Sequence, residues 1–123
     1  MKRYYLDNKL AKWLLFPSCH TIAIGWLVFS KKSEISDRTK VHETIHAMQW
    51  TEVTIVSLFF FAMVSPWWML ASPLVYYVWY VLEWLMRLPR GNAYRSILFE
   101  REAFEHDDDI EYLINRELFA WLR

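Results

Sequence analysis

Two histidines and a glutamate near the middle of the chain have the spacing of a zinc-hydrolase motif. His42, Glu43 and His46 form a His-Glu-x-x-His sequence. On a helix the two imidazoles lie one turn apart on the same face, so both can bind one zinc ion. Glu43 then lies beside them and points toward a water that the metal activates. The pattern predicts a catalytic metal site, and the alternative is a chance occurrence.

A zinc hydrolase usually has a third protein ligand and an open position for water. The candidates lie downstream, where a helix is predicted from Tyr94 to Glu105: Glu100, Glu102, Glu105 and the adjacent His106. Spacing alone does not choose among them, because Glu102, Glu105 and His106 lie on neighbouring faces of one helix.

Hydrolysis also needs a group that stabilises the negative charge developing on the substrate carbonyl. Tyr94, Arg95 and His106 are close enough in sequence to the candidate ligands to serve, so we take His106 as a candidate catalytic residue. For Arg95 and Arg101 we favour the alternative that they form structural ion pairs with acidic neighbours.

The composition places this chemistry in a small membrane protein. The chain has 123 residues, which allows one domain at most, and 55% of them are hydrophobic and 19% aromatic, in keeping with apolar surface that meets lipid. The formal net charge is zero, so nothing indicates a nucleic-acid partner. Cys19 is the single cysteine, which excludes an internal disulfide.

The apolar residues are concentrated between the two halves of the predicted metal site. From Val53 to Leu82 the chain carries no charge, and these roughly 30 residues exceed the roughly 20 that one transmembrane helix needs. Pro66 and Pro73 divide the stretch, and a downstream ligand must return to the side where His46 lies. We therefore expect a helical hairpin over about residues 52–88, with segments 52–66 and 73–88.

Basic residues predict the orientation of this hairpin. No Lys or Arg lies between Lys40 and Arg87, whereas both flanks are rich in them. Cytoplasmic segments carry the excess of basic residues, so we expect both termini and the zinc site on the cytosolic side of a bacterial inner membrane.

The remaining elements are predicted from apolar runs and capping residues. Lys9 to Phe16 suits a short amphipathic helix, and residues 21–30 read as one extended strand. Good capping residues place the start of the metal-binding helix between Asp37 and Lys40. After Asp107 a final helix is expected, with one apolar stripe at positions 110, 113, 114, 118, 121 and 122.

The order of these features resembles a known family. His42-Glu43-x-x-His46, a transmembrane hairpin and a helix carrying Arg101-Glu102 are similar to the membrane-bound gluzincins, which include prenyl-protein-processing and heat-shock membrane proteases. The resemblance implies Glu102 as the third zinc ligand and the strand near residues 22–29 as a substrate-binding edge strand. It also implies a supporting Asp four residues after the ligand, where this chain has His106 followed by Asp107.

Most of the chain also resembles small Bacteroidota membrane zincins that carry Ala-Tyr-Arg followed by Phe-Glu-Arg-Glu-Ala, here residues 93–95 and 99–103. Together the residues and resemblances predict a mainly α protein with a membrane hairpin and a minimal zincin site.

The expected function is that of a zinc-dependent metallopeptidase acting on a peptide or membrane-protein substrate. A partner subunit or the lipid bilayer would complete the cleft, and the expected partners are the bilayer and a partner subunit or homo-oligomer. The rival expectation is a membrane-anchored interaction protein with a structural zinc or none. Glu43 favours the enzyme, because a structural zinc site does not need it.

Overall fold

One long helix carries the motif and much of the apolar surface. In the computed structural model, described here for residues 4–5, 21–30, 35–88 and 96–123, helix α2 runs without a break over Asp37–Val64. Ser36 caps it by accepting a hydrogen bond from the backbone N–H of Thr39 (3.2 Å). The predicted start of this helix is confirmed.

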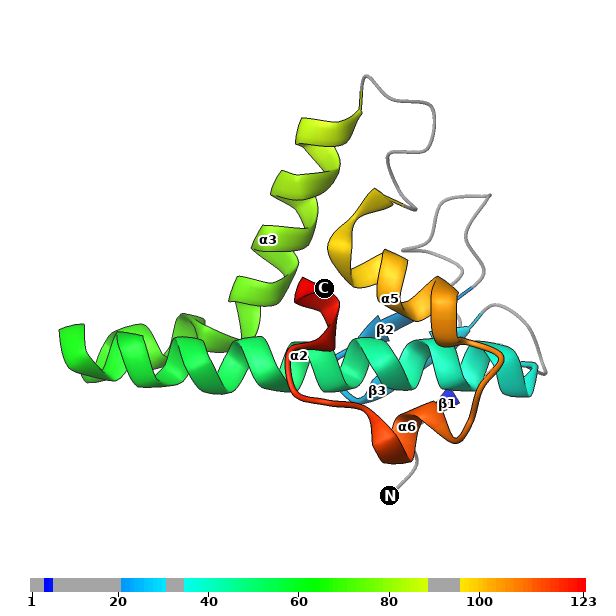
Figure 1. Ribbon diagram of the computed structural model, residues 1–123. Coiled ribbons are helices and arrows are strands. Elements are labelled where there is room, and N and C mark those ends of the chain that lie inside the picture. Colours follow the sequence, from blue (N-terminus) through cyan, green and yellow to red (C-terminus); the bar gives the residue numbers. More distant parts are fainter. Residues whose placement is uncertain (1–3, 6–20, 31–34, 89–95) are drawn as a thin grey trace.

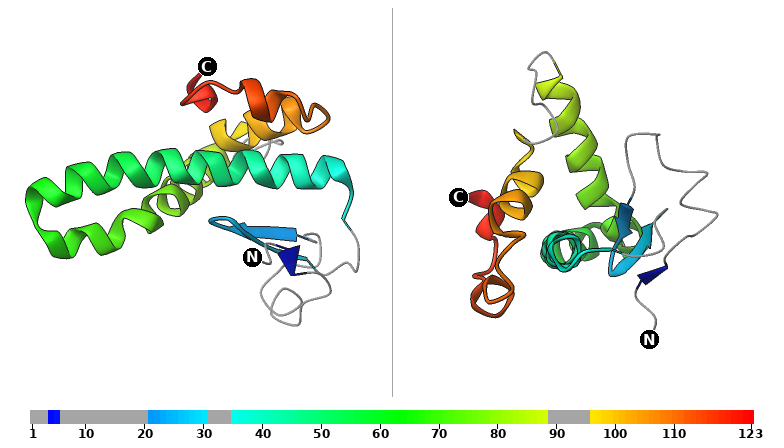
Figure 2. Two further views of the ribbon diagram at one scale, coloured as in Figure 1. Left: turned by 90° about the horizontal axis from the view of Figure 1, so that it is seen from below. Right: turned by 90° about the vertical axis from the view of Figure 1, so that its right-hand side faces the viewer.

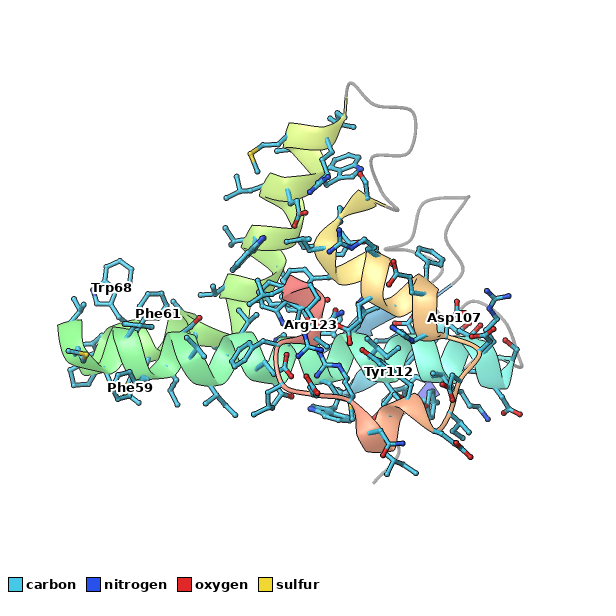
Figure 3. All side chains as sticks on the ribbon, in the orientation of Figure 1. Phe59, Phe61, Trp68, Asp107, Tyr112 and Arg123 are labelled. Carbon is cyan, nitrogen blue, oxygen red and sulfur yellow. The ribbon has the colours of Figure 1, made fainter. Side chains whose placement is uncertain are left out.

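The two ends of α2 have different surroundings. Buried residues gather from Val41 to Val53, whereas the distal turns expose large apolar side chains such as Phe59 (66% exposed) and Met63 (74%). In Figure 3 the labelled aromatic residues Phe59, Phe61 and Trp68 gather at one end of α2, far from Asp107 at the other. One helix thus joins a polar, largely buried half to an apolar, largely exposed half.

The chain reverses after Ser65 through the 3-10 helix η1 (Pro66–Ala71) and enters helix α3 (Ser72–Arg87). Figure 2 shows η1 and the start of α3 returning along α2, and Figure 1 shows α3 then rising steeply away from it. The segments 37–64 and 66–87 are both long and apolar enough to cross a membrane, and only 22% and 17% of their most apolar windows are buried. A core helix of a soluble protein would be mostly buried, so the predicted helical hairpin is supported; its orientation stays a prediction.

A small sheet lies against α2. Strands β1 (Tyr4–Tyr5), β2 (Thr21–Ile24) and β3 (Leu27–Ser30) are arranged in the order β1-β3-β2, with β1 parallel and β2 antiparallel to β3. In both views of Figure 2 α2 lies between this sheet and the C-terminal helices. β2 is an edge strand of the sheet.

The prediction of one strand over residues 21–30 is wrong, because the segment folds into a hairpin. Its turn is at Gly25, whose φ of +59° favours glycine. The Trp50 ring lies 3.5 Å from where a Cβ of Gly25 would be, and the backbone N–H of Gly25 donates to the hydroxyl of Tyr77 (2.6 Å). Two long-range contacts therefore bind the turn to α2 and α3.

Helix α5 (Leu98–His106) packs against α2 on the side opposite the sheet. Ala103 joins Val41 and Ile45 in one buried cluster, while Phe99 packs with Val53 and with residues of α3 and the C-terminus in a second. These two clusters fix the rotation of α5 about its own axis. The predicted start at Tyr94, and the expected helix from Lys9 to Phe16, fall outside the described residues.

The predicted continuous C-terminal helix is also wrong. The structure has one helical turn, α6 (Tyr112–Asn115), and a short 3-10 helix, η2 (Ala120–Leu122). The backbone leaves the helix at Arg116 (ψ 127°), whose guanidinium pairs with buried carboxylates, and Trp121 turns inward. These buried contacts stabilise the chain more than burial of the apolar stripe of a continuous helix would. As a result, Ile114 is left 84% exposed.

Candidate metal centre

Three side chains converge between α2 and α5. His42 Nε2 lies 3.1 Å from His46 Nε2 and 3.2 Å from Glu100 Oε2, and His46 Nε2 lies 3.3 Å from Glu100 Oε1. Four ligands bonded tetrahedrally to zinc at roughly 2.0–2.1 Å are separated by about 3.3 Å. Each histidine nitrogen thus lies at about this distance from the other and from one oxygen of the Glu100 carboxylate, and the group can hold a metal ion.

The hydrogen bonds of Gln49 orient the ring of His46. The Gln49 amide nitrogen donates to the carbonyl of Phe99 (2.9 Å) and to Glu102 Oε2 (2.8 Å), which leaves its oxygen facing His46 Nδ1 at 2.9 Å. The hydroxyl of Tyr76 also donates to this oxygen (3.1 Å). Since an amide oxygen only accepts, Nδ1 carries a hydrogen, and Nε2 is the ring nitrogen that can bind a metal ion.

Asp107 lies near the other ring nitrogen of His42, at ion-pair distance. Asp107 Oδ2 lies 3.5 Å from His42 Nδ1, and Oδ1 accepts a hydrogen bond from Arg38 Nε (2.7 Å). Asp107, one position after His106 and the C-cap residue of α5, is thus the aspartate that lies near the first histidine. A carboxylate on Nδ1 favours a hydrogen there and a lone pair on Nε2.

The converging atoms need a positive charge between them. Two imidazole lone pairs and one carboxylate repel one another unless a metal ion, or a proton on one ring, lies between them. Burial by itself would raise the pKa of Glu100, but the charge of His46 and hydrogen bonds from His42, His46 and Tyr80 hold this pKa well below its usual range. Tyr80 donates to Glu100 Oε1 at 2.6 Å. The carboxylate is therefore ionised, as a metal ligand must be.

Glu43 lies at the flank of this group. It is 8% exposed and close enough to His46 for their charges to interact. Glu43 and Trp50 are seven residues apart, so they share a face of α2, and the Trp50 ring contacts Gly25 of the sheet. Glu43 therefore lies between the candidate metal ligands and the hairpin of β2 and β3.

Glu102, which the resemblance implies as third ligand, lies in a separate buried cluster. Its carboxylate accepts hydrogen bonds from Tyr112 (2.8 Å), Arg116 and Gln49, and Arg116 also pairs with Glu52. Glu100, one of the carboxylates that spacing left open, is the one beside the histidines. Glu102 acts on the centre through Gln49.

The other two downstream candidates lie away from the three converging side chains. Glu105 is exposed. The ring of His106 stacks on that of Tyr112, with centroids 3.7 Å apart and planes 6° from parallel. The described contacts of His106 thus belong to the packing of α5 on α6, whereas Tyr94 and Arg95 fall outside the described residues.

The sequence reasoning missed the residues that orient the ligands. Gln49 is a polar residue three positions after His46 and just before the apolar run, a position that shares the face of the motif. Tyr76 and Tyr80 are four residues apart on α3 and so point to one side of it. Both spacings could have indicated polar partners for the centre, but the pairing of α3 with α2 lies beyond sequence pattern.

A hollow lies beside the first histidine. Its volume is about 320 Å³, and it is lined by Arg38, Thr39, His42, Phe104 and Asp107. The ring of Phe104 packs edge-on against His42, with centroids 4.7 Å apart. The centre can thus be approached from the N-terminal end of α2.

Comparisons with family models, curated proteins and solved structures gave no match for this chain. The site is therefore assigned from its own geometry: a His, His and Glu group that can hold a metal ion, next to two helices that can cross a membrane.

Proposed function

We propose that the protein is a membrane-embedded zinc metallopeptidase in which His42, His46 and Glu100 bind the metal and Glu43 is the general base. The observation that carries the proposal is the convergence of two histidine nitrogens and the two oxygens of Glu100, with contacts of 3.1–3.3 Å, and a second acidic residue, Glu43, at the position that the motif reserves for a base. Zinc bound there would lower the pKa of a coordinated water to about 7 and polarise a carbonyl.

The residues of the chain have separate tasks in this reaction. Gln49 and Asp107 hold the two imidazoles with their lone pairs inward, and Tyr80 holds the carboxylate of Glu100. Glu43 accepts the proton of the attacking water and later delivers it to the leaving amine. An extended peptide could pair with the edge of β2 to which no described strand is bonded, and it would then lie on the side of α2 that carries Glu43.

The substrate class follows from the setting of the site. α2 continues directly from the candidate ligands into the apolar segment, so a substrate bound here lies close to the membrane surface. We therefore propose a peptide or membrane-protein substrate that is cut near the cytosolic face.

A Glu43→Gln variant tests the assignment, because it preserves size and leaves the metal ligands intact. It should retain about one zinc per chain and lose hydrolysis in a fluorogenic peptide screen in detergent. Glu105→Gln, an exposed change of equal charge, is the matched control and should keep both. Hydrolysis that survives Glu43→Gln would refute the mechanism.

A structural zinc is the second candidate function, because the ligands come from two helices and a metal would fasten α5 to α2. In that case Glu43→Gln and wild type would bind zinc alike, neither would cleave any peptide in the screen, and zinc removal would separate the helices.

A further inference from the structure

The buried carboxylate of Glu83 on α3 has several hydrogen-bond donors at one oxygen and, among the described residues, none at the other. Glu83 is 4% exposed, and its Oε1 accepts from Arg87 Nε (3.1 Å) and from the backbone N–H of Leu98 (3.0 Å), with Arg87 Nη2 at 2.9 Å. Within the part of the chain that the structure describes, Oε2 is buried without any hydrogen-bond partner. Buried polar atoms are nearly always paired, so this oxygen indicates a missing donor.

The same carboxylate lines a cavity. Its volume is about 430 Å³, and its walls are Trp79, Glu83, Met86, Arg87 and Leu98. This size lies within the range of small-molecule sites. The last torsion of a glutamate side chain is soft, so a small rotation of the whole carboxylate can bring Oε2 toward a ligand in the cavity.

The cavity also offers a cation. A guanidinium carries five N–H groups, and the bonds described for Arg87 use only Nε and Nη2. The side chain of Arg87 is 29% exposed and lines the cavity, so its remaining N–H groups can donate to an anion there. Glu83 and Arg87 already neutralise each other, so a ligand without net charge fits best. Such a ligand is a zwitterion, with a protonated amine for Glu83 and an anionic group for Arg87.

The position of the cavity indicates where such a ligand comes from. It lies along the second half of α3, next to exposed apolar side chains such as Leu85 (49%) and Met86 (75%). If the hairpin crosses the bilayer as proposed above, this is the end of a span, where indole rings and basic residues meet lipid headgroups. Trp79 and Arg87 are such residues.

We propose that this cavity binds the headgroup of an aminophospholipid, with its primary ammonium on Glu83 Oε2 and its phosphate on Arg87. The ammonium supplies the donor that the carboxylate lacks, and the acyl chains lie along the exposed apolar side of α3. A quaternary choline headgroup has the same charges but no N–H, so it leaves Oε2 unpaired. This site rests on the membrane placement and is independent of the metal centre.

Native mass spectrometry of the full chain in a neutral detergent tests the proposal, with equimolar dioleoyl phosphatidylethanolamine and phosphatidylcholine as probes. Wild type should retain the ethanolamine lipid about 10-fold more than the choline lipid, because a hydrogen bond to a charged group is at stake. Glu83→Gln should bring this ratio near one, while Glu105→Gln should leave it unchanged. Equal retention by wild type, or a ratio that survives Glu83→Gln, would overturn the site.

Wild type alone provides a second measurement, in case Glu83→Gln fails to fold. Mono- and dimethylated ethanolamine lipids keep at least one N–H and should be retained better than the choline lipid. A headgroup preference unrelated to the N–H count would overturn the assignment. Full displacement of the lipid by soluble phosphoethanolamine would show that a free metabolite, and not a lipid, is the ligand. Removal of zinc by a chelator should not change the ratio of ethanolamine lipid to choline lipid. The lipid site and the proposed peptidase are therefore tested independently.

Discussion

The choice between two carboxylates two residues apart is the sharpest test of the metal centre. Replacing Glu100 by Gln removes the charge beside His42 and His46 but keeps the shape of the side chain. Loss of a residue that only supports a ligand typically costs 10- to 100-fold in metal affinity. Loss of the ligand charge should cost more, so we expect more than about 100-fold, or about 2.7 kcal/mol, for Glu100→Gln.

Glu102→Gln should have a smaller effect on zinc and a larger one on the fold. Glu102 reaches the centre only through Gln49, so its loss should cost no more than about 100-fold in zinc affinity. It also leaves buried Arg116 with Glu52 alone, which should lower the free energy of unfolding by about 1–3 kcal/mol. Exposed Glu105→Gln is the control and should change neither quantity.

Zinc affinity in this series is measured by competition with a chromophoric chelator in detergent, and unfolding by circular dichroism in denaturant. The decisive result is the order of the variants. A greater loss of zinc affinity in Glu102→Gln than in Glu100→Gln would identify Glu102 as the ligand. It would refute the inference that α5 directs Glu100 to the metal. Equal, small losses in both would refute the centre altogether.

Three further predictions concern the hydrogen bond that orients His46, the stability of the fold in acid, and the side of the membrane on which the site lies. Gln49→Leu should weaken zinc binding by about 10- to 100-fold in the same competition assay, because His46 Nδ1 loses its acceptor. In metal-free protein the lowered pKa of Glu100 stabilises the fold fully above its unfolded value of 4.5, and this contribution declines as the pH falls toward the folded pKa. An acid titration followed by circular dichroism should therefore show a shallower decline for Glu100→Gln than for wild type. In intact cells and a Cys19→Ser background, Leu70→Cys in η1 should react with an impermeant thiol reagent and Ile114→Cys should not; the reverse pattern would invert the orientation.

Some features of the fold and the site could be predicted from the sequence alone, because they depend on residues close together in the chain. The His-Glu-x-x-His spacing needs only a helix to bring two imidazoles together, and Ser36 and its neighbours mark where that helix begins. The uncharged run and its two prolines predict two apolar helices with a turn. These features depend on residues within a few positions of one another, so the sequence alone specifies them.

The strand and the C-terminal helix show where such reasoning ends. A run rich in β-branched and aromatic residues predicts extended backbone, but the chain turns at Gly25, and Trp50 and Tyr77, from two distant helices, pack against this turn. Arg116 breaks a favourable amphipathic pattern, because pairing with Glu52 and Glu102 is possible only once α2 and α5 have come together.

The sequence by itself determined that two histidines and a flanking glutamate share one helix, and that the candidates for a third metal ligand follow the apolar hairpin. Only the tertiary structure decided which of these candidates lies beside the histidines. Glu100 and Glu102 are two residues apart on α5, so they point in directions about 200° apart around the helix axis. Burial of Phe99 and Ala103 sets the rotation of α5, and this rotation directs Glu100 to the histidines and Glu102 to Gln49 and Arg116.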